Sequence, residues 1–168
     1  MKEIKKIILG FSENPNINQY GNLIEAYLLK LELKLKESFP ELPVSLNDKS
    51  ILPINVPENP TFLVSVTIQK DSDFGIKIGY NSQSKDSERI TSFIKEELRK
   101  WICLHACSIE VIQDIPLNSS KLNDNIFYTE IVLHGDDNLI QGKFSDESYA
   151  DAFSDTISSG IREYINSN

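Results

Sequence analysis

The sequence predicts an α/β fold: a three-layer sandwich in which a mostly parallel or mixed central sheet of about six strands carries helices on both faces. Short apolar runs with strand character alternate along the chain with longer segments whose apolar residues recur at helical spacing. The most strand-like run, Thr61–Lys70, is apolar on both alternating faces, which is typical of a strand in the middle of a covered sheet. The length of 168 residues predicts one domain, 1–168, with room for a core.

The other strands are predicted from short apolar runs between polar, Gly-containing or Pro-containing loops. They are Lys5–Gly10, Pro43–Leu46, Phe74–Tyr80, Ser108–Gln113 and Ile126–Leu133. Only three residues, Asp71–Asp73, separate Thr61–Lys70 from Phe74–Tyr80. So short a turn predicts that these two strands pair as a hairpin, which would make the sheet mixed.

Three helices are predicted from apolar residues that repeat every three or four positions. They are Asn22–Phe39, which Pro40 ends, Ser84–Ile102, and Ser145–Ile165. Three prolines in Asn47–Pro60 keep that segment out of regular structure, so we expect an ordered connector there.

Composition excludes several classes of function. Seventeen basic and twenty-five acidic residues give a net charge of −8, and such a surface repels nucleic-acid phosphates. No apolar run approaches the roughly 20 residues needed to span a bilayer. The apolar run Ile7–Leu9 is too short for a secretion signal, so we expect a cytoplasmic protein. Two cysteines do not make a disulfide framework.

Cys103, His105 and Cys107 place three potential zinc ligands within five residues. On a helix the two cysteines share a face while the histidine points to the other side, so one ion cannot collect all three. The sequence therefore favours helix-end packing over a metal site. Neither a phosphate-binding glycine motif nor an EF-hand spacing of aspartates occurs in the chain.

Glu130 is the most informative candidate for chemistry, because a carboxylate inside an apolar strand is costly to bury without a partner. It can serve as a general acid or base, with His134 or Asp136 nearby on the following segment. The alternative is structural: Glu130 would lie on an edge strand or accept hydrogen bonds from a loop.

The order of segments resembles the zinc-dependent N-acetylmuramoyl-L-alanine amidases of bacterial cell-wall hydrolysis. The resemblance rests on a helix, a glutamate-bearing strand and a closing helix, namely SKDSERITSFIKEELRKW (Ser84–Trp101), IFYTEIVLHGDDN (Ile126–Asn138) and DESYADAFSDTISSGIREYI (Asp146–Ile165). It implies the amidase fold, a cell-wall glycan or peptide as ligand, and Glu130 at the position of the catalytic acid/base.

The same resemblance implies that the zinc ligands are replaced. The family holds one zinc with a histidine after Gly at the end of the first strand, a glutamate before the first helix, and a Ser-x-His motif on the third strand. Phe11, Asn18 and Thr67 stand at these three positions, and Gln69 lies beyond the last of them. None of the three replacements substitutes for the family's ligands at a catalytic zinc. We therefore expect no zinc cofactor and a cleft lined by Phe11, Asn18, Thr67 and Gln69.

The sequence thus favours a non-catalytic relative of these amidases that keeps the scaffold for ligand binding or for assembly with a protein partner. Three alternatives remain open at this point: a hydrolase of another class that uses Glu130 with His134, a residual cell-wall amidase, and an interaction domain with a dimer interface.

Overall fold

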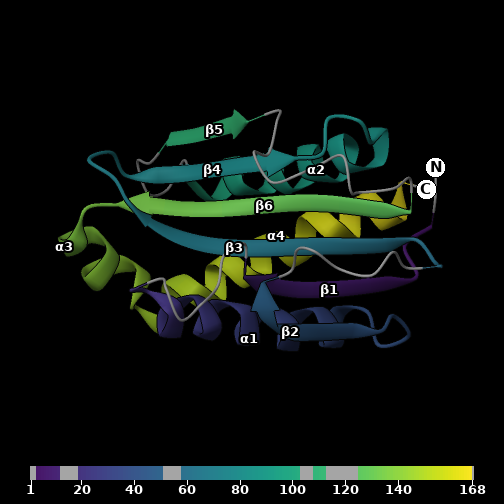
Figure 1. Cartoon of the computed structure of the whole chain (residues 1–168), viewed down its shortest axis with the longest axis horizontal. Coiled ribbons are helices and arrows are strands. Elements are labelled where there is room, and N and C mark those ends of the chain that lie inside the picture. The colour runs from purple at the N-terminus through teal and green to yellow at the C-terminus, as the bar shows by residue number, and fades with distance from the viewer. Residues whose placement is uncertain (1–2, 12–18, 51–57, 103–107, 113–124, 168) are drawn as a thin grey trace.

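A computed structural model describes residues 3–11, 19–50, 58–102, 108–112 and 125–167. Six strands form one sheet in the order β2-β1-β3-β6-β4-β5 (Figure 1). Their bounds are β1 Lys6–Phe11, β2 Val44–Ser50, β3 Thr61–Lys70, β4 Gly75–Tyr80, β5 Ser108–Ile112 and β6 Ile126–Gly135. β4 runs antiparallel to β6, and the other neighbouring strands are parallel. The predicted mixed sheet of about six strands is confirmed.

The predicted hairpin is wrong, because β6 lies between β3 and β4. β3 pairs in parallel with β6 from Thr61 to Lys70, and β4 pairs with the opposite edge of β6. The Asp71–Asp73 turn therefore crosses the end of β6, where the Asp71 amide donates a 2.9 Å hydrogen bond to the carbonyl of Gly135. A short connection sets how far apart two strands lie, but a third strand fits between them when the turn spans its end.

β2 is longer than the sequence predicts. Its pairing with β1 begins at Ile7 and Val44 and continues beyond Leu46 to Ser50. The register shifts before Phe11, which pairs with Ser50, so β2 contains extra residues at an irregularity of the bulge type. The polar residues after Leu46 thus belong to a strand and not to the expected connector.

Three long helices, α1 (Gly21–Ser38), α2 (Lys85–Ile102) and α4 (Glu147–Asn166), lie close to their predicted ranges. A short helix, α3 (Asp137–Leu139), and a π-helical turn, η2 (Ile140–Phe144), precede α4. Figure 1 shows α1, α4 and α2 on the same side of the sheet, and α4 contacts both of the others. The described residues therefore place the three long helices in one layer on one face of the sheet, and a second layer of helices is not found among them.

Strand alternation explains this one-sided arrangement. Val64 and Val66 of β3 belong to the apolar core formed with the helices, whereas Leu63 is equally buried but lies outside that core cluster. Thr91 of α2 bonds Thr129 of β6 through their hydroxyl oxygens at 2.6 Å, which identifies the face of β6 that meets the helices. Burial of both faces of β3 was expected correctly, but it does not require helices on both sides.

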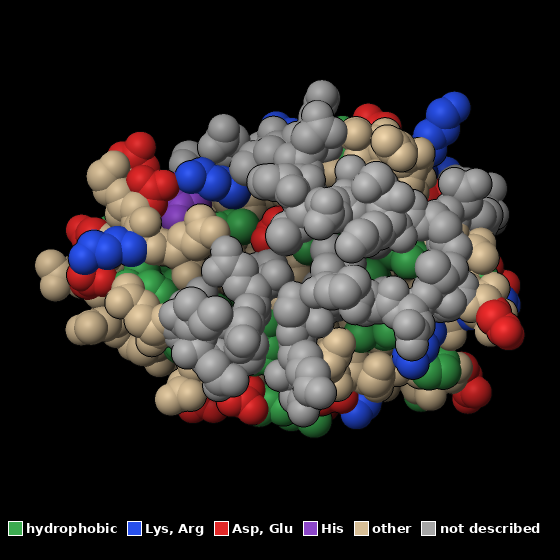
Figure 2. Space-filling view, in the orientation of Figure 1, with side chains coloured by type: hydrophobic (Ala, Val, Ile, Leu, Met, Phe, Trp, Pro, Cys, Tyr) green, Lys and Arg blue, Asp and Glu red, His purple; other side chains and the backbone are tan. Residues whose placement is uncertain are grey.

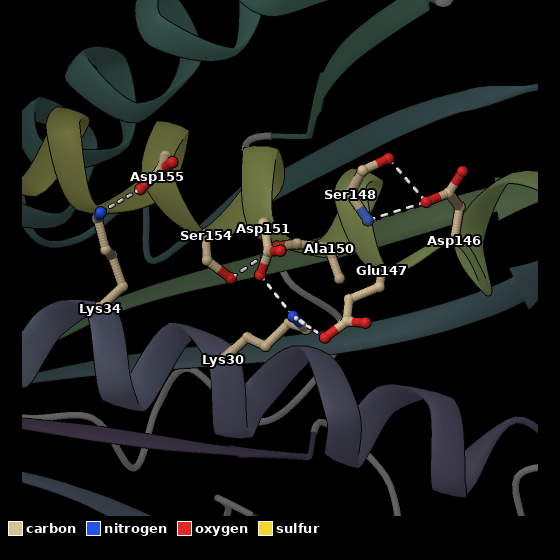
Figure 3. A network of polar contacts seen from close by, with 9 residues as sticks. All are labelled: Lys30, Lys34, Asp146, Glu147, Ser148, Ala150, Asp151, Ser154 and Asp155. Carbon is tan, nitrogen blue, oxygen red and sulfur yellow. Dashed lines mark hydrogen bonds and ion pairs between the residues drawn. The ribbon is translucent and has the colours of Figure 1, made fainter.

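α4 joins the helical layer through close apolar packing and surface ion pairs. Tyr27 of α1 meets Phe153 of α4 edge to face, with ring centroids 5.3 Å apart. Lys30 of α1 forms ion pairs with Asp151 at 2.5 Å and with Glu147 at 3.1 Å, both on α4 (Figure 3). Asp151 is the main cause of the raised pKa of Lys30. In the part of the chain that the structure describes, no helix is both long and apolar enough to cross a membrane.

Replacing Gly160 tests the contact between α4 and α2. A Cβ atom at Gly160 would lie 2.6 Å from Cα and 2.9 Å from the backbone nitrogen of Ile94, so the two helices must separate. We expect Gly160→Ala to lower the free energy of unfolding by about 1–3 kcal/mol, as overpacking does. Gly142→Ala is the matched control, because its Cβ meets no atom within 4 Å. Urea unfolding followed by circular dichroism measures both, and equal stability of the two variants would contradict the close packing.

Candidate functional site

The candidate site lies on the face of β3 and β6 that points away from the helices. Ser65 pairs with Glu130 across these parallel strands, and Thr67 pairs with Val132, so Ser65, Thr67 and Glu130 share one face. Parallel strands of an α/β sheet bind ligands at their carboxyl ends. Figure 2 views the molecule from this side, and charged side chains of both signs gather at the end that carries α3.

Tyr128 completes a polar row on this face. Its hydroxyl lies 2.8 Å from the hydroxyl of Ser65, and both side chains are fully buried. Burial raises the pKa of Tyr128 strongly, and the negative charge of Glu130 raises it further. The phenol therefore stays protonated. Either hydroxyl of the pair can donate the hydrogen bond to the other.

Glu130 lies in the centre of the sheet and is half-buried. The explanation that places it on an edge strand is wrong, because β6 has a paired strand on each side. Glu130 lies on the same face of the sheet as the Ser65–Tyr128 pair, and its negative charge raises the pKa of Tyr128. Glu130 and Thr67, which the sequence named as separate candidates, lie on one face of the sheet. Sequence reasoning missed Tyr128, whose only signal was its position two residues before Glu130 on the same strand.

Phe11 does not line this site. It pairs with Val66 at the end of β1, shares a face with Leu9, and is 5% exposed within the apolar core on the helix side. The prediction that Phe11 and Thr67 line one cleft is therefore wrong, because alternation along paired strands directs them to opposite faces. Asn18, the third position that the resemblance marks, lies outside the described residues.

Gln69 lies on the same face as Thr67 but at the exposed end of β3, opposite His134. Thr67 is only 2% exposed. The two residues are thus a surface position and a buried position, and they do not form the continuous lining that the sequence predicts.

His134 is not the partner of Glu130. Four residues along one strand separate their Cα atoms by about 13 Å, which is beyond a water-mediated contact. The His134 ring instead lies 2.7 Å from the carbonyl oxygen of Asp73, and its Nδ1 is 3.7 Å from the carboxylate of Asp71. The hypothesis of a Glu130–His134 acid/base pair is wrong, and His134 holds the turn that crosses the end of β6.

A second polar cluster stands beside that turn. Asp137 accepts a 2.7 Å hydrogen bond from the Tyr20 hydroxyl and forms an ion pair with Lys70, which is the main cause of its lowered pKa. Tyr20 and Asp137 line an open hollow of about 480 Å³. These residues join α1, β3 and α3 at the carboxyl edge of the sheet, and only the tertiary structure brings them together.

The described residues do not fit a catalytic zinc. They contain no group of three or more His, Cys, Asp or Glu side chains placed to hold a metal ion. The face around Glu130 offers the hydroxyls of Ser65, Thr67 and Tyr128, whereas zinc is held by imidazole, thiolate or carboxylate ligands. Cys103, His105 and Cys107 lie outside the described residues.

No protein-family model and no curated protein sequence matches the chain. Solved structures do. The CwlD amidase from Clostridioides difficile, in complex with the GerS lipoprotein, is similar with a TM-score of 0.72 and 18% identity over 98% of this chain and 100% of that chain. An N-acetylmuramoyl-L-alanine amidase from Clostridium difficile 630 gives a TM-score of 0.71 and 16% identity over 99% of each chain.

The catalytic domain of CwlV, an N-acetylmuramoyl-L-alanine amidase from Bacillus (Paenibacillus) polymyxa var. colistinus, gives a TM-score of 0.66 and 13% identity over 98% of this chain and 100% of that chain. At these identities the likeness establishes the fold. The chain therefore has the fold of N-acetylmuramoyl-L-alanine amidases over nearly its whole length, as the sequence resemblance implied.

A double-mutant cycle tests the Ser65–Tyr128 pair. Ser65→Ala leaves a buried phenol without this partner, so we expect the free energy of unfolding to fall by about 1–3 kcal/mol. Tyr128→Phe removes the other hydroxyl, and the double variant should lose less than the sum of the two single changes. Urea unfolding measures all four proteins. Strict additivity would show that the two hydroxyls do not interact.

The Asp71 carboxylate gives the turn an acid-sensitive contact. Its 3.0 Å hydrogen bond from Lys77, together with the Asp73 amide, lowers the pKa of Asp71 from 3.8 to about 2. A lowered pKa in the folded state adds stability above the unfolded pKa and loses it as the pH falls through the folded pKa. At pH 6 we expect the wild type to have a higher melting temperature than Asp71→Asn. This difference in melting temperature should disappear as the pH falls from about 4 to about 2. A difference that does not depend on pH would contradict this assignment.

Proposed function

We propose that this protein is a non-catalytic relative of N-acetylmuramoyl-L-alanine amidases, which keeps their scaffold for binding or assembly. The observation that carries the proposal is the burial of Thr67. It occupies the place of the histidine in the family's Ser-x-His motif and is 2% exposed. A buried hydroxyl at that place supplies no ligand of the kind that a catalytic zinc requires.

Phe11 supports the same proposal from the neighbouring strand. Where the resemblance expects a histidine ligand, β1 continues as a strand through Phe11, and the phenyl ring packs in the core with Leu9. Replacement of the ligand is therefore accompanied by a backbone path that directs this side chain to the helix face. A single reverse substitution does not recreate the metal site.

Glu130 remains at the position of the family's acid/base, but it acts on a different neighbour. A carboxylate acts as a general base only when a proton to be removed lies within hydrogen-bond reach. The Ser65–Tyr128 pair lies on the same face of the sheet, and its phenol is held in the protonated form. We assign Glu130 a role in ordering this polar face.

The comparisons support a protein as the binding partner of this scaffold. The CwlD structure is that of a complex with the GerS lipoprotein, so a protein with this fold presents a surface to another protein. A glycan or peptide ligand is the second candidate, because the likeness in fold is to enzymes named for N-acetylmuramoyl-L-alanine.

Metal content and hydrolysis test the proposal together. Protein purified without chelators and then dialysed against excess zinc should contain well below one zinc per chain by plasma mass spectrometry. It should also release no peptide from muropeptides under conditions in which an active amidase of this fold does so.

Glu130→Gln and Glu147→Gln form a matched pair for this assay, because Glu147 is exposed on α4. We expect wild type and both variants to give the same background. Stoichiometric zinc in the wild type, or cleavage that Glu130→Gln alone abolishes, would overturn the proposal in favour of a residual amidase.

A further inference from the structure

A hollow of about 370 Å³ lies where the end of α2 meets the start of α4, remote from the polar sheet face. It is formed by residues of α2, η2 and α4, and therefore lies in the helical layer. Its lining includes Trp101, Gly142, Lys143, Asp146, Ser148 and Tyr149.

One wall of the hollow is aromatic and rigid. Trp101 is half-buried, and its ring meets Tyr149 edge to face with centroids 4.7 Å apart. Tyr149 in turn contacts Phe144 at 5.4 Å, and Phe144 stacks on Phe74 at 5.6 Å. This row of four rings fixes the indole, while part of its surface remains open to solvent.

The lining also includes a carboxylate, a hydroxyl and an ammonium group. Asp146 accepts hydrogen bonds from the amide of Ser148 at 2.8 Å and from its hydroxyl at 2.7 Å, and these bonds lower the pKa of Asp146. An ionised carboxylate has about four acceptor positions, so the bonds from Ser148, together with that from the Tyr149 amide, use only part of its capacity. Lys143 adds further donors, with its Nζ 4.9 Å from the ring centre of Phe74.

The π-helical turn shapes the entrance. η2 includes Gly142 and Lys143, and such turns are frequent at functional sites. A Cβ atom at Gly142 would meet nothing within 4 Å, so the rim is open at this point.

We propose that this hollow binds a pyranose sugar. A sugar ring presents a face of C–H groups, which the negative face of an aromatic ring attracts, and hydroxyls at its edge that both donate and accept hydrogen bonds. Trp101 supplies the ring, and Asp146, Ser148 and Lys143 supply acceptors and donors. An anion would meet the Asp146 carboxylate and a net charge of −8, and a cation would meet Lys143, so a neutral polar ligand fits best.

This proposal names a site that the proposed function does not use, although a glycan is one of the candidate ligands of that function. The hollow shares no residue with the face around Glu130, so the zinc and hydrolysis measurements leave it untouched. Conversely, failure to bind sugar here says nothing about the amidase-like site.

The single tryptophan makes the test direct, because Trp101 is the only one in the chain. Titration with tri-N-acetylchitotriose, and separately with cellotriose, should change the tryptophan fluorescence saturably with a dissociation constant in the millimolar range. A response to the first sugar alone assigns the site to acetamido sugars, and a response to both assigns it to pyranoses in general. Absence of a saturable change with either sugar would overturn the proposal.

Three variants locate the binding while keeping the fluorescent residue. Gly142→Leu should fill the open rim and weaken binding by about tenfold or more, whereas Glu147→Gln, exposed on α4 outside the hollow, should stay within about twofold of wild type. Asp146→Ser retains a helix-capping hydroxyl and removes the carboxylate, so it should bind several-fold more weakly without loss of α4. Thermal unfolding verifies the fold of each protein. Wild-type affinity in both Gly142→Leu and Asp146→Ser would place the sugar elsewhere and overturn the assignment.

Discussion

The insertion of β6 between β3 and β4 is the constraint on which the rest of the structure depends. β6 takes a parallel partner on one edge and an antiparallel partner on the other, so one strand joins the two halves of the sheet. The three-residue turn from Asp71 to Asp73 crosses its end and is held there by the Gly135 carbonyl and the His134 ring. Because of this arrangement, Glu130 lies at the centre of the sheet and the His134 side chain contacts the turn.

The sidedness of the sheet follows from the same pairing. Regular register from β1 through β3 to β6 assigns each residue to one face, so Phe11 joins the core under the helices while Thr67 and Glu130 point the other way. The helix face is apolar and packs against α1, α2 and α4. The other face buries the Ser65–Tyr128 hydrogen bond, which satisfies two hydroxyls that would otherwise be costly to bury.

α4 holds the helical layer together and reaches the aromatic hollow. It packs against α2 at Gly160 and against α1 at Phe153, and its capping residue Asp146 stands at the rim of the aromatic hollow. The amidase fold thus offers separate surfaces for separate uses. The polar face around Glu130 and the hollow in the helical layer share no residue.

By itself, the sequence determined the mixed α/β class, the approximate ranges of the three long helices, and the central place of Thr61–Lys70. Helical and strand periodicities are local, and side-chain burial imprints them directly on the chain. The sequence also determined which chemistry is absent at the marked positions, because Phe11 and Thr67 carry no imidazole whatever their surroundings.

Only the tertiary structure decided which strand pairs with which, and which face each candidate residue meets. Periodicity reports that a residue is buried, but not what buries it, so the hairpin and the shared cleft of Phe11 and Thr67 were predicted wrongly. For the same reason the sequence did not show that the three long helices of the described residues form a single layer. The contact of Ser65 with Tyr128, and that of Trp101 with Tyr149, join residues distant in the chain. Such contacts depend on strand order and helix placement, which are properties of the whole packed molecule.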